Sequence, residues 1–328
     1  MLPRKKLSIM DTRRIAAIAL RVGDFDHFEQ KMEEARLRLE QAASLGAELA
    51  VLPESINIYC GDGPGNPKAM TIDEVAFDSL EPVAGLLAKA RDLHIALAFG
   101  LFLREGGVLR NVMLFYDQDG KYRGRYVKRN PTSQEMAAGV VPGADDQELI
   151  DWNEIKVGGA ICFDTNFDEV FASQAAAGAK LMLVPSLWDG GRWLPQTAVR
   201  NGIAMAVSYG AWSRIINFDG TVLDASGYRE ESVGFGNSLP LAVASVNFDF
   251  ATFHMCGNAA KIPAILSRYG KHLLYKSDTE NSVFYLASLS HDFTVADIIA
   301  EFGLIKFSDF FSAYRLEKKE IVEKALAK

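Results

Sequence analysis

The segment KVGGAICFD, residues 156–164, joins a run of small and apolar residues to a cysteine and an aspartate. The run at 156–161 predicts a buried strand, and this strand ends at Cys162. Residues 167–177 then show a helical pattern, and residues 180–184 return to the apolar pattern of a strand. A strand, a helix and a second strand in this order predict a mixed α/β fold whose sheets are covered by helices on their outer faces.

The alternation of strands and helices continues on both sides of this segment. Towards the N-terminus, we expect strands at 14–20, 48–52, 94–103 and 111–116 and helices at 24–45 and 73–93. Towards the C-terminus, hairpins dominate, with strands expected at 204–208, 213–217, 222–224 and 242–248. No repeat or low-complexity tract interrupts the series.

The last part of the chain has a different character. Residues 295–326 predict a helical region that is rich in apolar and aromatic side chains. So many aromatic residues cannot all face water, and we expect them to pack on the main domain or on a partner subunit. We therefore divide the chain into a main domain at 1–255 and a mainly helical C-terminal extension at 256–328.

Charge and composition exclude several classes of protein. The chain has 328 residues and a formal net charge of -7, so no positive field favours nucleic acid. It has three cysteines, an odd and sparse set that is a poor disulfide framework and is typical of a reducing compartment. The start of the chain lacks a secretory apolar region, and no apolar run approaches the roughly 18 residues of a membrane span. We expect a cytoplasmic protein that binds neither nucleic acid nor membrane.

Three polar side chains stand at the ends of predicted strands. Glu54 follows the apolar run at 48–52, Lys128 closes a short strand pattern, and Cys162 ends the strand described above. Sites in α/β folds gather beyond the carboxyl ends of strands, where these residues can meet. A thiol that is mostly protonated at neutral pH needs a base, which a glutamate supplies, and a lysine can hold a developing oxyanion. The set suits acyl transfer from an amide.

Taken singly, each of these residues has a simpler interpretation. Cys162 could be a small apolar residue in a buried strand, Glu54 could cap the following helix, and Lys128 could be a surface charge. Their order and spacing favour catalysis, since Glu54 precedes Lys128 by 74 residues and Cys162 follows Lys128 by 34.

This arrangement resembles the nitrilase superfamily of carbon–nitrogen hydrolases, in its amidase- or carbamoylase-like branch. Members carry a glutamate at an LPE-like strand end, a lysine after a strand and a cysteine in a GxxIC segment. The corresponding segments here are 52–54, 126–128 and 158–164, and shorter matches occur at 142–143, 185–188 and 218–220. The resemblance spans roughly residues 12–250. The segment 197–201 departs from the family pattern, because Arg200 stands where many members have a glutamate. This departure puts the local hydrogen bonds in doubt, but not the chemistry.

The resemblance implies a four-layer α-β-β-α sandwich, with residues 1–255 as the carbon–nitrogen hydrolase domain, and association into a homodimer or a larger homo-oligomer. By position, Glu54 would be the general base and acid and Cys162 the nucleophile. Lys128 would stabilise the oxyanion together with the backbone N–H of Phe163. Glu135, seven residues after Lys128, resembles a second glutamate that many amidases keep beside the lysine, and a positioning role is implied for it. No cofactor or metal is implied.

The residues around the cysteine also indicate a class of substrate. The pair at 163–164 resembles amidases, whereas nitrilases tend to have Trp-Glu there, so a small amide or N-carbamoyl compound is favoured over a nitrile. Trp188 and Arg192 follow the next strand and are candidate substrate contacts, although an exposed loop residue is the simpler interpretation of Arg192. Nitrile hydrolysis, acyl transfer to an amine and a non-catalytic assembly role stay open as alternatives.

Overall fold

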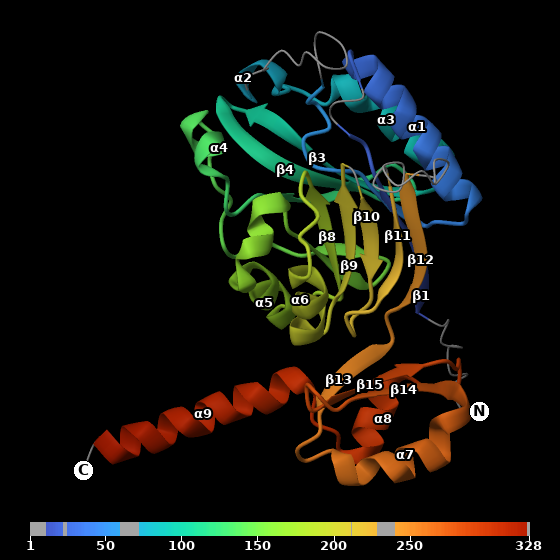
Figure 1. Cartoon of the computed structure of the whole chain (residues 1–328), viewed down its shortest axis with the longest axis vertical. Helices are drawn as coiled ribbons and strands as arrows, with labels where there is room; N and C mark the ends of the chain where they lie inside the picture. Colours follow the sequence, from blue (N-terminus) through green and yellow to red (C-terminus); the bar gives the residue numbers. More distant parts are fainter. Residues whose placement is uncertain (1–10, 22–24, 60–71, 211, 228–239, 327–328) are drawn as a thin grey trace, which may run out of the picture. The chain divides into compact units, whose positions relative to one another are not determined.

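The computed structural model describes residues 11–21, 25–59, 72–210, 212–227 and 240–326 of the chain (Figure 1). The chain forms two compact units. The larger unit is Arg13–Val246, and the smaller combines Met1–Thr12 with Asn247–Lys328. The division therefore falls before residue 255, where the sequence pattern places the end of the main domain.

The first sheet of the larger unit has six strands in the order β12-β1-β2-β3-β4-β5. Their bounds are β12 (Leu241–Asn247), β1 (Thr12–Ile18), β2 (Leu49–Val51), β3 (Ala96–Glu105), β4 (Val108–Tyr116) and β5 (Tyr122–Val127). β1, β2 and β3 run parallel, whereas β4 and β5 return antiparallel beside them. The parallel strands are continuous apolar runs because both of their faces are covered.

The second sheet also has six strands, in the order β11-β10-β9-β8-β7-β6. Their bounds are β11 (Val222–Ser226), β10 (Ser213–Ile216), β9 (Ala204–Tyr209), β8 (Leu181–Ser186), β7 (Ile155–Gly159) and β6 (Ile150–Trp152). β7, β8 and β9 are parallel, and β6, β10 and β11 pair antiparallel at the two sides. Both sheets thus have a parallel part, and each parallel part presents the carboxyl ends of its strands at one edge.

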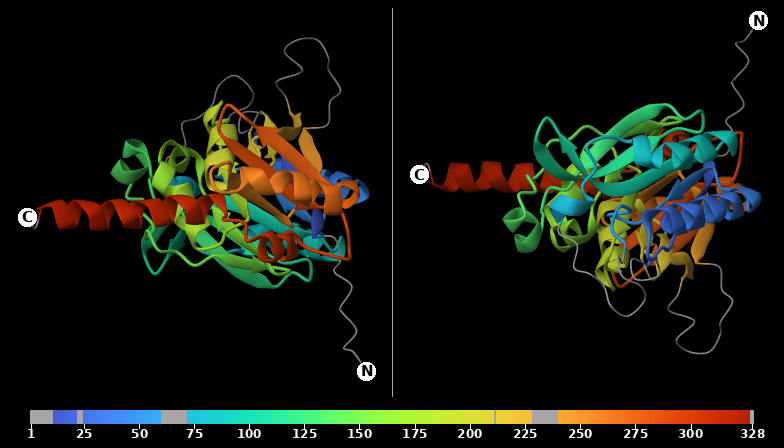
Figure 2. Two further views of the ribbon diagram at one scale, coloured as in Figure 1. Left: turned by 90° about the horizontal axis from the view of Figure 1, so that it is seen from below. Right: turned by 90° about the horizontal axis from the view of Figure 1, so that it is seen from above.

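Helices cover the outer face of each sheet. α1 (Phe28–Ser44) and α3 (Ala84–Asp92) lie side by side and share one hydrophobic cluster with β1, β2 and β3 (Figure 2). On the second sheet, α5 (Asp168–Ala176) packs on β7 through a pair of hydrogen bonds, in which the Gln174 side-chain amide accepts the Gly159 N–H and donates to Gly159 O. α6 (Trp193–Asn201) lies beside α5 (Figure 1).

Two adjacent glycines of β7 show how closely these layers approach. A Cβ at Gly158 would lie 2.5 Å from the Gln174 side chain of α5. A Cβ at Gly159 would lie 2.6 Å from Tyr126 of the first sheet. Because successive residues of a strand face opposite sides, Gly158 allows the helix to approach and Gly159 allows the first sheet to approach. This layering confirms the predicted α-β-β-α sandwich.

The smaller unit is built on a three-stranded antiparallel sheet that the sequence patterns did not predict. Its strands are β13 (Phe250–His254), β15 (Val283–Ser288) and β14 (Leu273–Asp278), in this order. α7 (Ile262–Tyr269) and α8 (Val295–Phe302) contribute to its hydrophobic cluster. The predicted helical region after residue 295 is confirmed, but it divides at Gly303, whose φ of 58° ends α8 before α9 (Phe307–Leu326) begins.

One long helix expected in the larger unit is also divided. In place of a helix at 73–93, the chain forms α2 (Ile72–Val75), the 3₁₀ helix η2 (Glu81–Val83) and α3. Pro82 lies in η2, and a proline inside a helix removes a backbone donor and crowds the preceding turn. Among the described residues, the other short helices are α4 (Ser133–Ala137), η3 (Cys162–Asn166), η5 (Ala259–Lys261) and η6 (Gly270–His272). Over the described ranges, no helix has both the length and the apolar character that crossing a membrane requires.

Candidate active site

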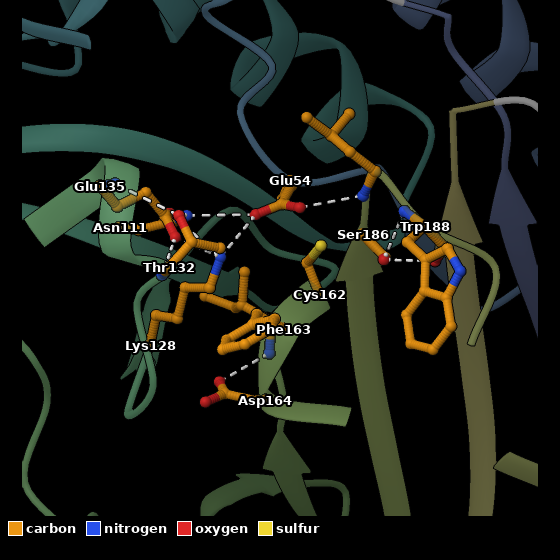
Figure 3. A network of polar contacts seen from close by, with 12 residues as sticks. Glu54, Asn111, Lys128, Thr132, Glu135, Cys162, Phe163, Asp164, Ser186 and Trp188 are labelled. Carbon is orange, nitrogen blue, oxygen red and sulfur yellow. Dashed lines mark hydrogen bonds and ion pairs between the residues drawn. The ribbon is translucent and has the colours of Figure 1, made fainter. Parts of the chain in front are cut away.

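Three strand ends of the larger unit bring the predicted site residues together (Figure 3). Glu54 follows β2, Lys128 follows β5, and Cys162 follows β7. Lys128 Nζ lies 3.4 Å from Glu54 Oε2, and the Cys162 side chain lies beside the same carboxylate (Figure 3). Residues from two sheets and three distant parts of the sequence therefore form one contiguous polar group.

The Glu54 carboxylate receives hydrogen bonds on both of its oxygens. The Leu187 N–H donates to Oε1 at 2.9 Å, and Asn111 Nδ2 donates to Oε2 at 3.1 Å, next to Lys128. On its other side β3 passes so close that a Cβ at Gly100 would lie 2.6 Å from Glu54 Cα. With 3% of its surface exposed, the carboxylate is held in one position in a nearly dry setting.

Glu135 reaches Lys128 because of the way α4 begins. The Thr132 side chain accepts the Glu135 N–H at 3.2 Å, and Glu135 Oε2 accepts the Thr132 N–H at 2.6 Å, which is a capping box. The same carboxylate lies against the lysine, with Nζ 3.0 Å from Oε1 and 2.9 Å from Oε2. Lys128 thus lies between two glutamates, at 2% exposure of its side chain.

Lys128 and Glu135 stabilise each other's charged forms. Burial lowers the pKa of Lys128, but Glu54, Glu135 and Cys162 outweigh burial and raise that pKa above its ordinary value. Burial also raises the pKa of Glu135, but the Lys128 charge and hydrogen bonds from Thr132, Asn111 and Lys128 bring it below its ordinary value. At neutral pH the lysine is therefore a cation and Glu135 an anion.

Asn111 is a member of this group that the sequence analysis did not identify. It lies on β4, is fully buried, and its amide nitrogen donates to Glu54 Oε2 at 3.1 Å and to Glu135 Oε1 at 2.7 Å. One amide group thus links the Glu54 and Glu135 carboxylates, and on Glu54 it binds the oxygen that the Leu187 N–H does not bind. The signal available in the sequence was a single amide side chain at the start of an otherwise apolar strand, and that signal is weak by itself.

Cys162 occupies a sharp turn after β7, as the first residue of η3. Its φ of 46° is in the left-handed region, which costs a residue other than glycine on the order of 1–3 kcal/mol. Asp164 holds this turn: its Oδ2 accepts the Ile161 N–H at 3.0 Å and the Tyr126 hydroxyl at 2.9 Å. Its Oδ1 accepts the Asn130 N–H at 2.7 Å. Asp164 was part of the predicted motif, but this anchoring function was not predicted.

The thiol of Cys162 is protonated at neutral pH. Burial raises its pKa, the neighbouring Glu54 carboxylate raises it further, and Lys128 lowers it only in part, which leaves a pKa of about 12. A thiol in this state is a poor nucleophile until a base removes its proton. Glu54 is the base that lies beside this thiol (Figure 3).

Phe163 and Trp188 border this group with partly exposed rings. Phe163 is 39% exposed and packs edge-on against Phe167, with ring centroids 5.6 Å apart. Trp188 is 38% exposed, and its backbone N–H donates to Ser186 Oγ at 2.9 Å at the end of β8. Within the described part of the chain, no hydrogen bond engages the Phe163 N–H.

Arg192 is not brought into this group. It is exposed at the start of α6, and no contact among the described residues joins it to Glu54, Lys128 or Cys162. A different arginine, Arg214, holds the loop that precedes α6. Arg214 is 4% exposed and donates to the carbonyl oxygens of Gly191, at 3.1 Å, and Asp189. The sequence analysis did not identify this buried arginine.

A comparison with protein families agrees with this geometry. The model of the carbon-nitrogen hydrolase family matches residues 14–238, which is more than half of the chain. The chain belongs to the carbon-nitrogen hydrolase family. The matched residues include Glu54, Lys128 and Cys162 and end before β12 and the smaller unit.

The relatives of this family member include both nitrilases and amidases. The Bifunctional nitrilase/nitrile hydratase NIT4B of Lupinus angustifolius is 26% identical over 182 residues, 51% of this chain and 51% of that protein. The chloroplastic Omega-amidase of Arabidopsis thaliana is 26% identical over 174 residues, 49% of this chain and 46% of that protein. The chain spans about half the length of the curated relatives it matches.

Solved structures support the fold. An amidase of the nitrilase superfamily from Nesterenkonia AN1 superposes with a TM-score of 0.58 at 22% sequence identity, covering 74% of this chain and 94% of that one. Nit3 of Saccharomyces cerevisiae also gives a TM-score of 0.58, at 19% identity. The chain therefore has the fold of the nitrilase superfamily.

Proposed function

We propose that this chain hydrolyses the C–N bond of a small amide or N-carbamoyl compound through a thioester on Cys162. The observation that carries the proposal is the position of the Glu54 carboxylate, which lies beside the Cys162 thiol (Figure 3) and contacts Lys128 at 3.4 Å. A base, a nucleophile and a cation gathered in one place are the parts that acyl transfer needs.

In the first half-reaction, the sulfur bonds to the substrate carbonyl carbon while Glu54 takes the thiol proton. The raised pKa of Cys162 favours this coupled transfer over attack by a preformed thiolate. The carbonyl π electrons move to oxygen, and the oxyanion accepts hydrogen bonds from Lys128 Nζ and the Phe163 N–H. Glu54 then gives the proton to the leaving nitrogen as the C–N bond breaks, which releases ammonia or an amine and leaves a thioester.

In the second half-reaction, Glu54 takes a proton from water as the water oxygen bonds to the thioester carbon. The C–S bond then breaks, the sulfur recovers the proton from Glu54, and the carboxylic acid leaves. Glu135 and Asn111 take no proton in this cycle. They hold Lys128 and Glu54 in position through contacts of 2.7–3.1 Å.

Nitrile hydrolysis is the second candidate, because several curated relatives are named nitrilases. A nitrile would bond to the same sulfur and receive the same proton, so the described residues permit both reactions. A panel of matched pairs, each an amide and the nitrile of the same carbon skeleton, separates them by the ammonia released. We expect turnover of amides to exceed that of the paired nitriles. If every nitrile were turned over faster than its paired amide, nitrile hydrolysis would replace amide hydrolysis as the proposed function.

Cys162→Ala is the test of the covalent mechanism. We expect this variant to lose activity on every substrate by at least a thousandfold while its unfolding temperature stays within a few degrees, since a methyl group replaces a small thiol. Cys256→Ala, which changes an exposed cysteine of the smaller unit, is the matched control and should keep full activity. Activity retained in Cys162→Ala would exclude a thioester at this residue.

A further inference from the structure

The strand that leads to Lys128 lies at the edge of its sheet. Among the described strands, β5 is the outermost of the first sheet, and it pairs on its inner side with β4, Val127 opposite Val112. Val127 is buried and is the last residue of β5. A buried backbone N–H or C=O without a partner is costly, so the outer side of this residue needs hydrogen bonds from elsewhere in the chain.

The side chain of Gln147 supplies them. Its Oε1 accepts the Val127 N–H at 2.6 Å, and its Nε2 donates to Val127 O at 2.7 Å. Nε2 also donates to Ala144 O at 2.9 Å, which closes the segment 143–147 on itself. One primary amide therefore makes the two hydrogen bonds that a residue of a neighbouring antiparallel strand would make.

The same segment binds the two residues that follow Val127. The Gly143 N–H donates to Lys128 O at 2.8 Å, and Asp145 Oδ1 lies 3.0 Å from Nη2 of Arg129, whose side chain is buried. The approach is close enough that a Cβ at Gly143 would lie 2.4 Å from Val127 O. The segment thus holds three consecutive residues, with Lys128 in the middle.

We propose that Gln147 is a positioning residue that acts through Lys128. The lysine side chain is long and flexible, so the place that its ammonium reaches depends on where its backbone is fixed. Nζ lies 3.4 Å from Glu54 and 2.9 Å from Glu135, and displacement by a fraction of an ångström changes both contacts. The effect of Gln147 on turnover rests on the proposed function, in which Lys128 holds the oxyanion.

The position of Lys128 also affects Cys162 when no substrate is present. The pKa of the thiol is raised by burial and by Glu54, and the Lys128 charge opposes this rise. If the ammonium withdraws, the pKa of the thiol rises further and less of it is thiolate, the form that alkylating reagents attack. Loss of Gln147 is therefore measurable at Cys162 without any turnover.

The rate of alkylation at Cys162 is the first test. The full chain is treated with limiting iodoacetamide at pH 9, and the rate is followed by the mass of the Cys162 peptide. Gln147→Leu removes the amide but keeps a side chain of similar size, and it should slow alkylation about threefold or more. The matched control is Gln134→Leu, at an exposed position of α4, which should alkylate at the wild-type rate.

The same substitution in a Lys128→Met chain tests whether the effect passes through the lysine. Two changes that act through one group are not additive, so Gln147→Leu should slow alkylation no further in that chain. Wild-type alkylation in the single variant Gln147→Leu would overturn the proposal, as would an equal loss with and without Lys128. Both results stay readable if the chain hydrolyses no amide.

Turnover of an amide is the second test. Gln147→Leu should lower kcat about tenfold or more with KM within about twofold of wild type, because the shift affects the oxyanion donor. A raised KM with unchanged kcat would contradict a role through Lys128. If Gln147→Leu does not fold, Gln147→Glu replaces it in both tests, since it keeps the shape and the acceptor for Val127 N–H but lacks the Nε2 donor. Smaller losses in the same direction are expected for it, and wild-type alkylation would overturn the proposal.

Discussion

Lys128 is one buried cation in contact with two buried carboxylates. This imbalance of charge determines how much stability each substitution in the group costs. The Glu54 and Glu135 side chains lie 3.4 Å and 2.9 Å from its Nζ, all at less than a tenth exposure. A buried ion contributes little by itself, but removing its partner leaves an uncompensated charge in a medium that cannot solvate it. Loss of Lys128 leaves two such charges, whereas loss of Glu135 leaves one balanced pair.

We therefore expect Lys128→Met to destabilise the fold by about 3–5 kcal/mol in urea unfolding. If the proposed chemistry holds, it also loses an oxyanion donor, which lowers kcat by roughly 10²–10³-fold. Glu135→Gln should cost less stability, because Lys128 and Glu54 remain paired. Lys156→Met is the control, since its ion pair with Asp151 is half exposed and its loss should change stability by about 0.5 kcal/mol or less. Equal destabilisation by Lys128→Met and Glu135→Gln would contradict the charge argument.

Lys31 of α1 gives a prediction for stability against pH. It is 1% exposed and donates to the carbonyl oxygens of Ser55, at 3.4 Å, and Ile58, at 2.8 Å, just after Glu54. Burial lowers its pKa from 10.5 to about 7. Between these two values the unfolded chain holds a proton that the folded chain does not, so the free energy of unfolding rises with pH through this window, by at most about 1.4 kcal/mol per pH unit.

Lys31→Met removes this dependence along with the two hydrogen bonds. Below pH 7 the folded wild-type chain holds a buried charge that the variant lacks, and this disadvantage disappears as the pH approaches 10. The variant should therefore lose stability relative to wild type as the pH rises from 7 to 10, in urea unfolding at four or more pH values. A difference between the two chains that stays constant over this range would show that Lys31 keeps its proton when folded.

At the scale of elements, the close approach of β3 to the end of β2 is what holds Glu54 in place. A Cβ at Gly100 would lie 2.6 Å from Glu54 Cα. Because that atom belongs to the backbone, the clash can be relieved only by moving the strand end that carries Glu54. We expect Gly100→Ala to destabilise the fold by about 1–3 kcal/mol and to lower kcat more than it raises KM, because the carboxylate moves. Gly85→Ala is the matched control: it lies in α3, where the added Cβ would be 3.6 Å from the Arg36 guanidinium, and should stabilise by about 0.5–1 kcal/mol. Equal effects of the two changes on kcat would show that the β2–β3 approach does not position Glu54.

The elements that could be predicted from sequence are those whose pattern is local. Apolar runs predicted the buried strands of both sheets except β6, and helical spacing predicted α1 and α5, because both faces of a parallel strand and one face of a helix are buried. The three strands of the smaller unit could not be found in this way. β14 alternates buried and exposed residues only in part, and its pairing with β15 depends on contacts that no local pattern encodes.

The same distinction applies to the residues of the site. Glu54, Lys128 and Cys162 were candidates because each is a polar side chain at the end of a predicted strand, and Glu135 was a candidate through the family resemblance. Asn111 and the Leu187 N–H were not, because their importance comes only from the Glu54 oxygens they face in the folded chain. A backbone donor has no sequence signal at all.

At the scale of the whole molecule, the division of the chain is set by the pairing of β13. The sequence patterns place a boundary at residue 255, which would leave β13 with the hydrolase domain. β13 instead pairs with β15 over five residues, from Phe250 with Ala287 to His254 with Val283, inside the smaller unit. Truncation experiments are therefore best cut at Val246, where the larger unit ends.

α9 is largely exposed in the single chain. None of its residues is buried, and Tyr314, Ile321 and Val322 are 57%, 59% and 46% exposed. We expect such a helix to pack on a partner subunit, so that a chain ending at Ala313 sediments as particles with fewer subunits than the full chain forms. Arg315→Ser is the control and should leave the number of subunits unchanged. The same number of subunits for the full and shortened chains would show that α9 has no role in assembly.

The most direct test of the central claim is the mass of the protein during turnover. The full chain is mixed with an amide substrate, quenched in acid within milliseconds to seconds, and its intact mass and the mass of the Cys162 peptide are measured. The account predicts an added acyl group, without the leaving nitrogen, on Cys162 in the wild-type chain. It also predicts a hundredfold or greater slowing of that addition in Glu54→Gln, because the amide cannot accept the thiol proton. An acyl group that forms at the wild-type rate in Glu54→Gln, or that forms on any residue other than Cys162, would contradict it.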